Sequence, residues 1–351
     1  MDIHDLLRQS ASMGASDLHM TVGIPPTSRV HGRLVRLNEE RLTPADTEEF
    51  IRALLSPEQF EKLRELGEVD LSVSVFGQYR YRVNAYTQRG SYAAAMRLVE
   101  SKILSFAQLG LPTVTEELCW RSRGLILVTG PTGSGKSTTL AAMIDLINAK
   151  RDCHIITLED PIEYLHRHKR SIVNQREIGN DTRSYTAALR AALREDPDII
   201  LVGEMRDLET IAIALTAAET GHLVLSTLHT VGAAKTIDRV IDVFPPHQQQ
   251  QVRVQLSMTL QGVVSQQLIP RVDEKGRVAA VEVMLANPAV RNLIREGKTP
   301  QINNVIMTSA RQGMKTMDNA IVDLYKNGLI TLDEAMLHSV DAEYMQRLIH
   351  L

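Results

Sequence analysis

The sequence predicts an α/β protein of two domains, a small α+β domain followed by a larger domain built on a parallel sheet. Two patterns indicate this. The first hundred residues contain short segments in which apolar and polar residues alternate, as in antiparallel strands. From residue 123 onward, continuous apolar runs alternate with helical patterns, as in parallel sheets covered by helices on both faces. A chain of 351 residues that is 44% hydrophobic is long enough to bury two cores.

In the first domain, helical periodicity covers residues 2–13 and 44–66. The second of these segments opens with Thr43 as N-cap and Pro44 in the first helical position. Four segments alternate like strands: 28–37, 69–76, 79–87 and 91–98. Between the second and third of them, Phe76-Gly77-Gln78 predicts a hairpin turn.

Gly110 and Pro112 interrupt the pattern between the two domains, so we expect a connector there. The expected boundaries are residues 1–100 for the first domain, 101–118 for the linker and 119–351 for the second domain.

In the second domain, four apolar runs predict strands: 124–129, 154–158, 199–202 and 222–227. Helical patterns follow the first three of them: one ends near residue 149, and the others cover 183–195 and 207–220. Gly221 is a suitable residue directly after the last of these helices. Beyond about residue 245 the pattern is mainly helical, and a hairpin around Glu274-Lys275-Gly276 interrupts it.

Composition narrows the class of protein. With a net charge of −3 and a pI near 6.4, the chain lacks the excess of positive charge that is typical of nucleic-acid-binding proteins. Cys119 and Cys153 are far apart and lack C-x-x-C spacing, which predicts reduced thiols of a cytosolic protein. No apolar run approaches the roughly 18 residues of a membrane span, and the start of the chain lacks the pattern of a signal peptide. Any membrane association is therefore expected to depend on a partner.

Residues 130–138, here called the phosphate loop, fit the pattern G-x-x-x-x-G-K-[ST]. The loop comprises Gly130, Pro131, Thr132, Gly133, Ser134, Gly135, Lys136, Ser137 and Thr138. It follows a predicted strand and precedes a predicted helix, the context in which backbone N–H groups cradle phosphates. Lys136 is expected to reach the terminal phosphates, Ser137 to ligate Mg²⁺ directly and Thr138 to cap the phosphate end. The sequence therefore predicts a site for ATP or another nucleoside triphosphate with Mg²⁺.

A second strand ends in a candidate catalytic residue. The apolar run 199–202 is followed by Gly203 and Glu204, in the form of a Walker B strand. Gly203 stands where such strands usually carry an aspartate. Glu204 is therefore the group expected to polarise the attacking water, and Mg²⁺ would depend more on Ser137, phosphate oxygens, water and other carboxylates.

Two further clusters follow strands at the edge where open α/β folds bind ligands. Glu159, Asp160 and Glu163 could supply the additional carboxylates, or they could form a solvated turn that caps a helix. His229 could sense or bind the γ-phosphate. His222 is as consistent with a structural role as with nucleotide binding. The two histidines lack cysteines or an HExxH arrangement around them, so no zinc site is expected.

Taken together, these motifs resemble the type IV pilus retraction ATPases (PilT-like proteins) of the secretion ATPase superfamily. The resemblance runs nearly from end to end. Besides the clusters above, it includes Gly14-Ala15-Ser16-Asp17-Leu18-His19, Arg80-Tyr81-Arg82-Val83-Asn84, the segment 173–179 and Gly313-Met314-Lys315-Thr316-Met317-Asp318. Gly203 before the catalytic glutamate is normal in this family.

The resemblance implies a hexameric ring of subunits with a PAS-like first domain and a RecA-like second domain. ATP would lie between the two domains at a subunit boundary, where Arg82 and Arg97 would complete the site. From the residues alone, these two arginines would be surface residues of strands. The implied activity is Mg²⁺-dependent ATP hydrolysis that powers pilus retraction and twitching motility. The protein would be cytoplasmic, at the inner face of the bacterial inner membrane, and would act through a platform protein there.

Several alternatives remain. An accessory, PilU-like retraction ATPase shares all these motifs, and such a protein could also be a partner. Assembly and type II secretion ATPases usually carry an additional N-terminal domain and a four-cysteine zinc motif, which this sequence lacks. A conjugation-type ATPase fits the segment 313–318 less well. A nucleic-acid motor would need a basic channel, whereas the basic cluster 166–170 is more typical of an exposed turn. A non-hydrolysing scaffold is disfavoured because Glu204 and Glu163 are both present.

Overall fold

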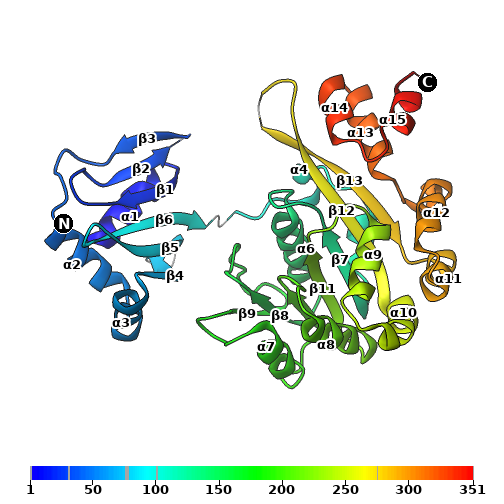
Figure 1. Ribbon diagram of the computed structural model, residues 1–351, viewed down its shortest axis with the longest axis horizontal. Helices are drawn as coiled ribbons and strands as arrows, with labels where there is room; N and C mark the ends of the chain where they lie inside the picture. The colour runs from blue at the N-terminus through cyan, green and yellow to red at the C-terminus, as the bar shows by residue number, and fades with distance from the viewer. Residues whose placement is uncertain (1, 31, 76–78, 100–101, 275, 351) are drawn as a thin grey trace. The chain divides into compact units, whose positions relative to one another are not determined.

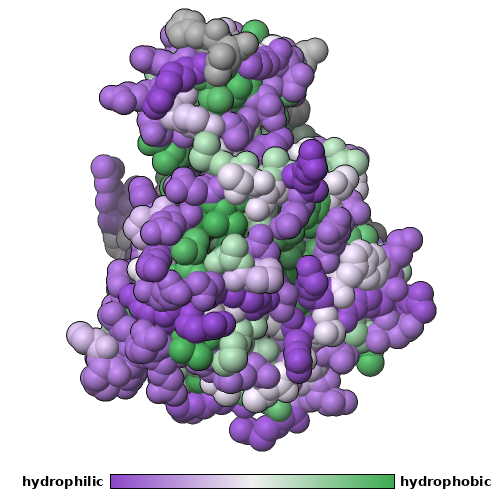
Figure 2. All heavy atoms as spheres, turned by 90° about the vertical axis from the view of Figure 1, so that its right-hand side faces the viewer, coloured by the Kyte–Doolittle hydropathy of each residue, from purple (hydrophilic) through white to green (hydrophobic). Residues whose placement is uncertain are grey.

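The computed structural model of the protein describes residues 2–30, 32–75, 79–99, 102–274 and 276–350 (Figure 1). The chain divides into two compact units. The first comprises Met1–Lys102 with Glu163–Leu165, and the second comprises Ile103–Ile162 with His166–Leu351. None of the described helices is long and apolar enough to cross a membrane. On the face shown in Figure 2 hydrophilic side chains predominate, with hydrophobic ones in smaller patches among them.

The first unit contains an antiparallel sheet with the strand order β3-β2-β1-β6-β5-β4. The strands are β1 (Ala15–Met20), β2 (Thr27–Val30), β3 (Arg33–Arg36), β4 (Glu68–Val75), β5 (Tyr79–Gln88) and β6 (Ser91–Val99). The helices are α1 (Ile3–Ser12), α2 (Pro44–Leu54) and α3 (Pro57–Leu66). Leu7, Phe50 and Leu63 of these helices are buried in one core with side chains of the sheet. The predicted small α+β fold with an antiparallel sheet is confirmed.

Three predictions for this unit need correction. The predicted helical segment 44–66 is two helices, because Ser56 and Gln59 form a capping box that starts α3. The predicted strand 28–37 is a pair of antiparallel strands, in which Val30 pairs with Arg33. Strand β1 was not predicted. The predicted turn at residues 76–78 lies outside the described residues.

The second unit contains a sheet with the strand order β13-β12-β7-β11-β10-β8-β9. Neighbouring strands are parallel from β12 to β9, and β13 is antiparallel to β12. The strands are β7 (Gly124–Thr129), β8 (His154–Glu159), β9 (Ile172–Glu177), β10 (Ile199–Val202), β11 (Leu223–Leu228), β12 (Leu260–Pro270) and β13 (Arg277–Leu285). The predicted parallel sheet is confirmed. Strand β9 was not predicted.

The helices of the second unit cover its sheet and continue into its C-terminal part (Figure 1). They are α4 (Phe106–Leu109), α5 (Val114–Leu118), α6 (Lys136–Lys150), α7 (Tyr185–Ala192), α8 (Leu208–Glu219), α9 (Ala233–Asp242), α10 (Pro246–Thr259), α11 (Pro288–Glu296), α12 (Ile302–Thr308), α13 (Met317–Lys326), α14 (Leu332–His338) and α15 (Ala342–His350), with 3₁₀ turns η1 (Thr299–Gln301) and η2 (Ala310–Gln312). Phe106 and Leu118, in the segment expected to be a connector, are buried in a core of this unit.

Strand β7 shows how the sheet is covered on both faces. Leu125 and Leu127 belong to one core, together with α8, α9 and α10, whereas Ile126 and Val128 belong to a second core, together with α6. Alternate residues of a strand point to opposite faces, so a strand buried on both sides must be apolar throughout. The strand can therefore hold its carboxyl end, where the phosphate loop begins, in a fixed position.

The C-terminal part is more β-rich than the sequence predicted. The hairpin predicted around residues 274–276 exists, although Lys275 lies outside the described residues. Its arms are long, and β12 pairs with β7 in the main sheet. The far end of this hairpin shares a separate core with α13, α14 and α15.

Candidate nucleotide site

The phosphate loop lies between β7 and α6, and its glycines have conformations that other residues rarely adopt. The φ angles are +141° at Gly130, +78° at Gly133 and +87° at Gly135. A Cβ atom on Gly130 would lie 2.2 Å from the carbonyl oxygen of Gln266, and one on Gly135 would lie 3.2 Å from its Nε2. Gly130 has no room for a side chain, Gly135 has little, and the backbone of the loop lies close against β12.

Lys136 begins α6 and is buried. Its ammonium group donates hydrogen bonds of 3.0 Å to the carbonyl oxygens of Gly130 and Pro131. Ser137 follows in the first turn of α6, where backbone N–H groups have no partners within the helix. Positive charge, backbone N–H groups and a hydroxyl therefore meet at the start of one helix. This set of donors fits the phosphates of a nucleotide and its metal ion.

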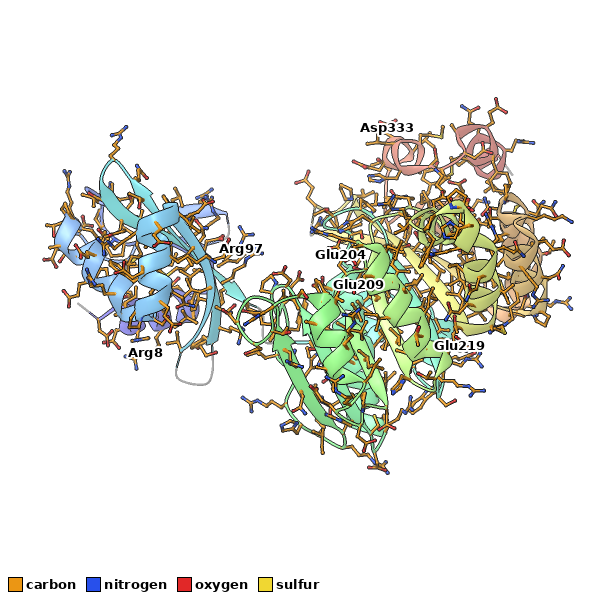
Figure 3. The ribbon with its side chains drawn as sticks, turned by 60° about the horizontal axis from the view of Figure 1, so that its bottom comes forward. Arg8, Arg97, Glu204, Glu209, Glu219 and Asp333 are labelled. Atoms are coloured by element: carbon orange, nitrogen blue, oxygen red, sulfur yellow. The ribbon has the colours of Figure 1, made fainter. Side chains whose placement is uncertain are left out.

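Glu204 follows β10, and its carboxylate is only 18% exposed. One oxygen, Oε1, lies 2.5 Å from Nε of Arg206 and 3.1 Å from Nε2 of His229. Figure 3 labels Glu204 within the second unit. The carboxylate predicted to act on water and the histidine predicted to sense phosphate are thus in direct contact.

These side chains open into one cavity of about 520 Å³ that also includes a residue of the phosphate loop. The cavity is lined by Thr132, Glu204, Met205, Arg206, Leu228, His229, Thr230 and Arg239. The structure thus brings together three of the clusters that the sequence singled out, because the strands that carry them are neighbours in the sheet.

Gly203 has a physical reason for lacking a side chain. A Cβ atom there would lie 2.9 Å from the Tyr185 hydroxyl, 3.1 Å from the Leu158 carbonyl oxygen and 3.4 Å from Cα of Glu159. The carbonyl oxygen of Leu158 also accepts a 2.7 Å hydrogen bond from the Gly203 N–H. An aspartate could not occupy this position without displacing its neighbours.

Carboxylates near Gly203 differ in their surroundings. Oε1 of Glu159 accepts hydrogen bonds from Thr157 (2.6 Å) and from Gln175 (3.1 Å), so this group joins β8 to β9. Burial raises the pKa of Tyr185, and Asp160, Glu204 and Glu159 raise it further. The phenol of Tyr185 therefore stays protonated among these carboxylates.

Glu163 is exposed and belongs to the first unit. Among the described residues, no group of three or more histidine, cysteine, aspartate and glutamate side chains could hold a metal ion.

His222 is placed away from the other candidates. Its carbonyl oxygen pairs with Gly124 at the amino end of β7, whereas the phosphate loop follows the carboxyl end of that strand. Its Nδ1 lies 3.0 Å from the carbonyl oxygen of Ala217 and 3.4 Å from the Thr220 hydroxyl, at the end of α8. In this structure His222 completes the end of a helix.

Arg82 and Arg97 belong to the first unit and lie directly opposite each other on β5 and β6. Like charges in this arrangement repel each other. Nε of Arg97 donates a 2.9 Å hydrogen bond to Oδ1 of Asp17. Burial opposes ionisation of Asp17, but hydrogen bonds from Ser16 and Arg97 hold the pKa of its carboxyl below the usual value.

Sequence reasoning missed three residues that shape the site. Arg206 neutralises Glu204, Tyr185 fills the space beside Gly203, and Gln266 donates a 2.8 Å hydrogen bond from Nε2 to the carbonyl oxygen of Ser134. Arg206 stands two residues after Glu204, a short distance that could have drawn attention to it. Tyr185 and Gln266 reach the site only through the order of the strands, for which the sequence carries no local signal.

Residues 14–337 match the type II/IV secretion system protein family. The type IV pilus retraction ATPase PilT of Pseudomonas aeruginosa is 51% identical over 95% of this chain and 97% of its own length. The type IV pilus ATPase PilU of the same organism is 40% identical over 100% of this chain and 92% of its own length. A crystal structure of the pilus retraction motor PilT with bound ADP superposes with a TM-score of 0.93, at 52% identity and 99% coverage of both chains. The chain therefore belongs to the type II/IV secretion system protein family, with pilus retraction ATPases among its full-length relatives.

Proposed function

We propose that this protein is a motor ATPase that hydrolyses ATP to power retraction of type IV pili and, through it, twitching motility. The observation that carries the proposal is the cavity in which Thr132 of the phosphate loop, Glu204 and His229 meet. It combines the phosphate loop with a carboxylate and an imidazole in contact. These groups can hold the phosphates and act on the attacking water, as hydrolysis requires. The match to a retraction motor along its full length connects this chemistry to the pilus.

The residues of the site suit a Mg²⁺·ATP substrate. Lys136 and the N–H groups of the phosphate loop would hold the β- and γ-phosphates, and the Ser137 hydroxyl would ligate Mg²⁺. When bound, Mg²⁺ neutralises charge on the phosphate oxygens. Glu204 would accept a proton from the attacking water. His229, whose Nε2 lies 3.1 Å from Oε1 of Glu204, would orient that carboxylate and contact the γ-phosphate.

We assign supporting roles to the carboxylates at the end of β8 and directly after it. Glu159 links the ends of β8 and β9, and Asp160 lies near Tyr185. Glu163 is proposed to support the water shell of Mg²⁺ or the attacking water. His222 is left out of the proposed site because it lies at the opposite end of β11 from His229.

The proposal includes a homo-hexamer. Arg82 and Arg97 would contact the γ-phosphate at a subunit boundary, because two adjacent guanidinium groups suit a multiply charged anion. We propose residues 1–100 as a PAS-like domain and 119–351 as a RecA-like domain, joined by residues 101–118, of which those from Ile103 onward belong to the compact second unit. The motor would act at the cytoplasmic side of the inner membrane, on a platform protein of the pilus machine and together with an accessory retraction ATPase.

Deletion of the gene tests the proposal. A retraction motor leaves cells with excess pili and no twitching when it is lost, and purified wild-type protein should release phosphate from Mg²⁺·ATP. Bald cells would identify an assembly motor instead. The absence of any ATP hydrolysis by assembled protein would contradict the motor function altogether.

The similarity to PilU over the whole chain favours one second candidate, an accessory retraction ATPase. Complementation separates the two. A primary motor restores twitching to a strain that lacks its own PilT, whereas an accessory motor restores only the defect of a strain that lacks PilU.

A further inference from the structure

Glu282 lies in the middle of β13, outside the proposed site, and its buried carboxylate joins two helices. One oxygen, Oε1, accepts a 2.6 Å hydrogen bond from the N–H of Ala233, the first residue of α9. The other, Oε2, accepts a 3.1 Å hydrogen bond from the N–H of Met317, the first residue of α13. Each helix has ten residues and a partial positive charge at its start. One carboxylate thus satisfies the ends of two helices at once.

On the α9 side, Glu282 acts together with the residue opposite it on β12. Ser265 pairs with Glu282 across the two strands, and its hydroxyl accepts a 2.9 Å hydrogen bond from the N–H of Gly232. Two neighbouring side chains therefore hold two consecutive N–H groups, those of Gly232 and Ala233. These are the residues at which the segment 229–232, here called the His229 loop, enters α9. The far end of the loop is fixed by this pair.

The first turn of α9 is also connected to the phosphate loop. The Thr236 hydroxyl lies 2.7 Å from that of Thr230, in the His229 loop. It also lies 3.5 Å from that of Thr129, the residue before the phosphate loop. The position of α9 therefore affects both sides of the cavity that contains Glu204.

On the α13 side, the connection extends to the end of the chain. Lys315 forms two backbone hydrogen bonds with Val283, the residue next to Glu282, so the segment before α13 is attached to β13. Asp318 in the first turn of α13 is buried. It accepts hydrogen bonds from the N–H groups of Val340 (2.7 Å) and Asp341 (3.1 Å), directly before α15. The C-terminal helices are thus attached to Glu282 through a second carboxylate.

An ionised carboxylate is expensive to bury, and an apolar side chain would fill this space without that cost. The pKa of Glu282 is raised: burial raises it most, Asp318 raises it further, and the two backbone hydrogen bonds offset only part of this. Because burying this carboxylate costs free energy, its presence indicates a role other than filling space in the core. The two hydrogen bonds, one to each helix, indicate what that role is.

We propose that Glu282 is a positioning residue that couples the His229 loop at the nucleotide site to the C-terminal helices α13–α15. Through it, binding at the site restrains the start of α13, and the position of α13 determines where His229 stands relative to Glu204. The inference rests on the proposed nucleotide site and adds the part of the molecule to which that site is linked.

Hydrogen exchange measured with and without ADP, on wild-type protein and the Glu282→Gln variant, tests the coupling. Glutamine keeps the size of the side chain but has one acceptor oxygen and no charge. In wild-type protein, ADP should slow exchange in segments 229–236 and 315–320. In Glu282→Gln, ADP should slow it in 229–236 alone. Slowing in both segments of the variant, or only in 229–236 of the wild type, would overturn the coupling.

Two control variants separate this link from a general loosening. Ser265→Ala removes a contact on the α9 side only, so exchange should rise in 229–236 and stay unchanged in 315–320. Asp318→Asn weakens the connection to α15 and should leave 229–236 unchanged without nucleotide. If either control reproduces the pattern of Glu282→Gln, Glu282 has no special position between the two helices.

Steady-state kinetics provide an independent readout. A displaced His229 loop should lower kcat of Glu282→Gln by about tenfold and change KM for ATP by less than about threefold. An unchanged kcat together with faster exchange at both helix starts would reduce Glu282 to a structural residue.

If Glu282→Gln does not fold, Glu282→Asp, which keeps the charge on a side chain shorter by one methylene group, provides the comparison because it should lengthen or lose at least one of the two contacts. If wild-type protein binds no ADP, the proposed function fails. Exchange at both helix starts of the nucleotide-free variant then still tests the link.

Discussion

The two units of this protein carry their charged residues in different ways. In the second unit, the candidate catalytic groups follow the carboxyl ends of parallel strands and meet in one cavity. In the first unit, Arg82 and Arg97 lie side by side on an antiparallel sheet, and Arg97 forms an ion pair with Asp17 on the neighbouring strand. The second unit contains a site that is complete enough to recognise, whereas the first presents two opposed arginines, one of which is paired with Asp17 of its own sheet.

The largest expected effect follows from removing the charge of Glu204. Glu204→Gln should keep ATP affinity within about threefold and lower hydrolysis by about 10³-fold, because the group acts on the water in the transition state. Single-turnover phosphate release and nucleotide binding measure the two effects. Glu209→Gln, an exposed glutamate of α8 that pairs with Arg190, is the matched control (Figure 3). Near-normal hydrolysis in Glu204→Gln would move the catalytic role to Glu163.

Substitution of Lys136 tests whether the phosphate loop contributes to the binding of ATP before hydrolysis as well as to the transition state. Lys136→Ala should weaken nucleotide affinity by about 30-fold or more and lower turnover in parallel, because a buried ammonium next to the phosphates is lost. Equilibrium titration with a fluorescent ATP analogue measures the affinity. Lys150→Ala, an exposed lysine at the other end of α6, should leave both quantities unchanged. Full affinity in Lys136→Ala would place the phosphates elsewhere.

Substitution of Arg97 tests whether the first unit takes part in ATP hydrolysis. Arg97→Ala should retain ATP binding and lose about tenfold in turnover, a moderate loss because Arg82 remains directly opposite. Specific activity of wild-type protein should also rise with concentration until rings are complete, and added Arg97→Ala should depress it more than simple dilution. The exposed Arg8 of α1, paired with Asp5, provides the control Arg8→Ala. Strictly linear dilution, with activity in a proven monomer, would confine catalysis to the second unit.

The smallest expected effect concerns Asp17, the residue that forms an ion pair with Arg97 in this structure. The pKa of Asp17 is lowered, so the stability gained from its ion pair is present above the unfolded value near 4. It is lost as the pH falls through the lower, folded value. Because Arg97 is 74% exposed, the effect should stay below about 1 kcal/mol. Denaturation of wild-type protein and Asp17→Asn should show a difference at pH 6 that shrinks progressively as the pH falls below about 4. A constant difference would exclude the ion pair as its source.

Much of the second unit could be predicted because its signals are local. Continuous apolar runs, the glycines of the phosphate loop and the acidic residue after a strand are all read from adjacent positions. The strands 124–129 and 199–202 agree with the structure at both ends. A local helix-start signal was also present where the prediction failed: Ser56 and Pro57 start a new helix within the segment 44–66.

The parts of the fold and of the site that could not be predicted depend on which strands become neighbours. The pairing of β12 with β7 brings Gln266 to the phosphate loop, and the pairing of β12 with β13 sets Ser265 opposite Glu282. No spacing in the sequence announces these contacts between distant segments. His222 and His229 flank the same strand, and only the direction of β11 in the sheet shows that His222 lies at the end away from the phosphate loop.

The crowding around Gly203 also constrains how this protein can change over generations. Because the Tyr185 hydroxyl and the Leu158 carbonyl oxygen occupy the space beside it, a Walker B aspartate acquired there by one substitution would have to displace these neighbours. A smaller residue in place of Tyr185 would remove one of the two obstacles. The two positions are therefore expected to evolve as a pair.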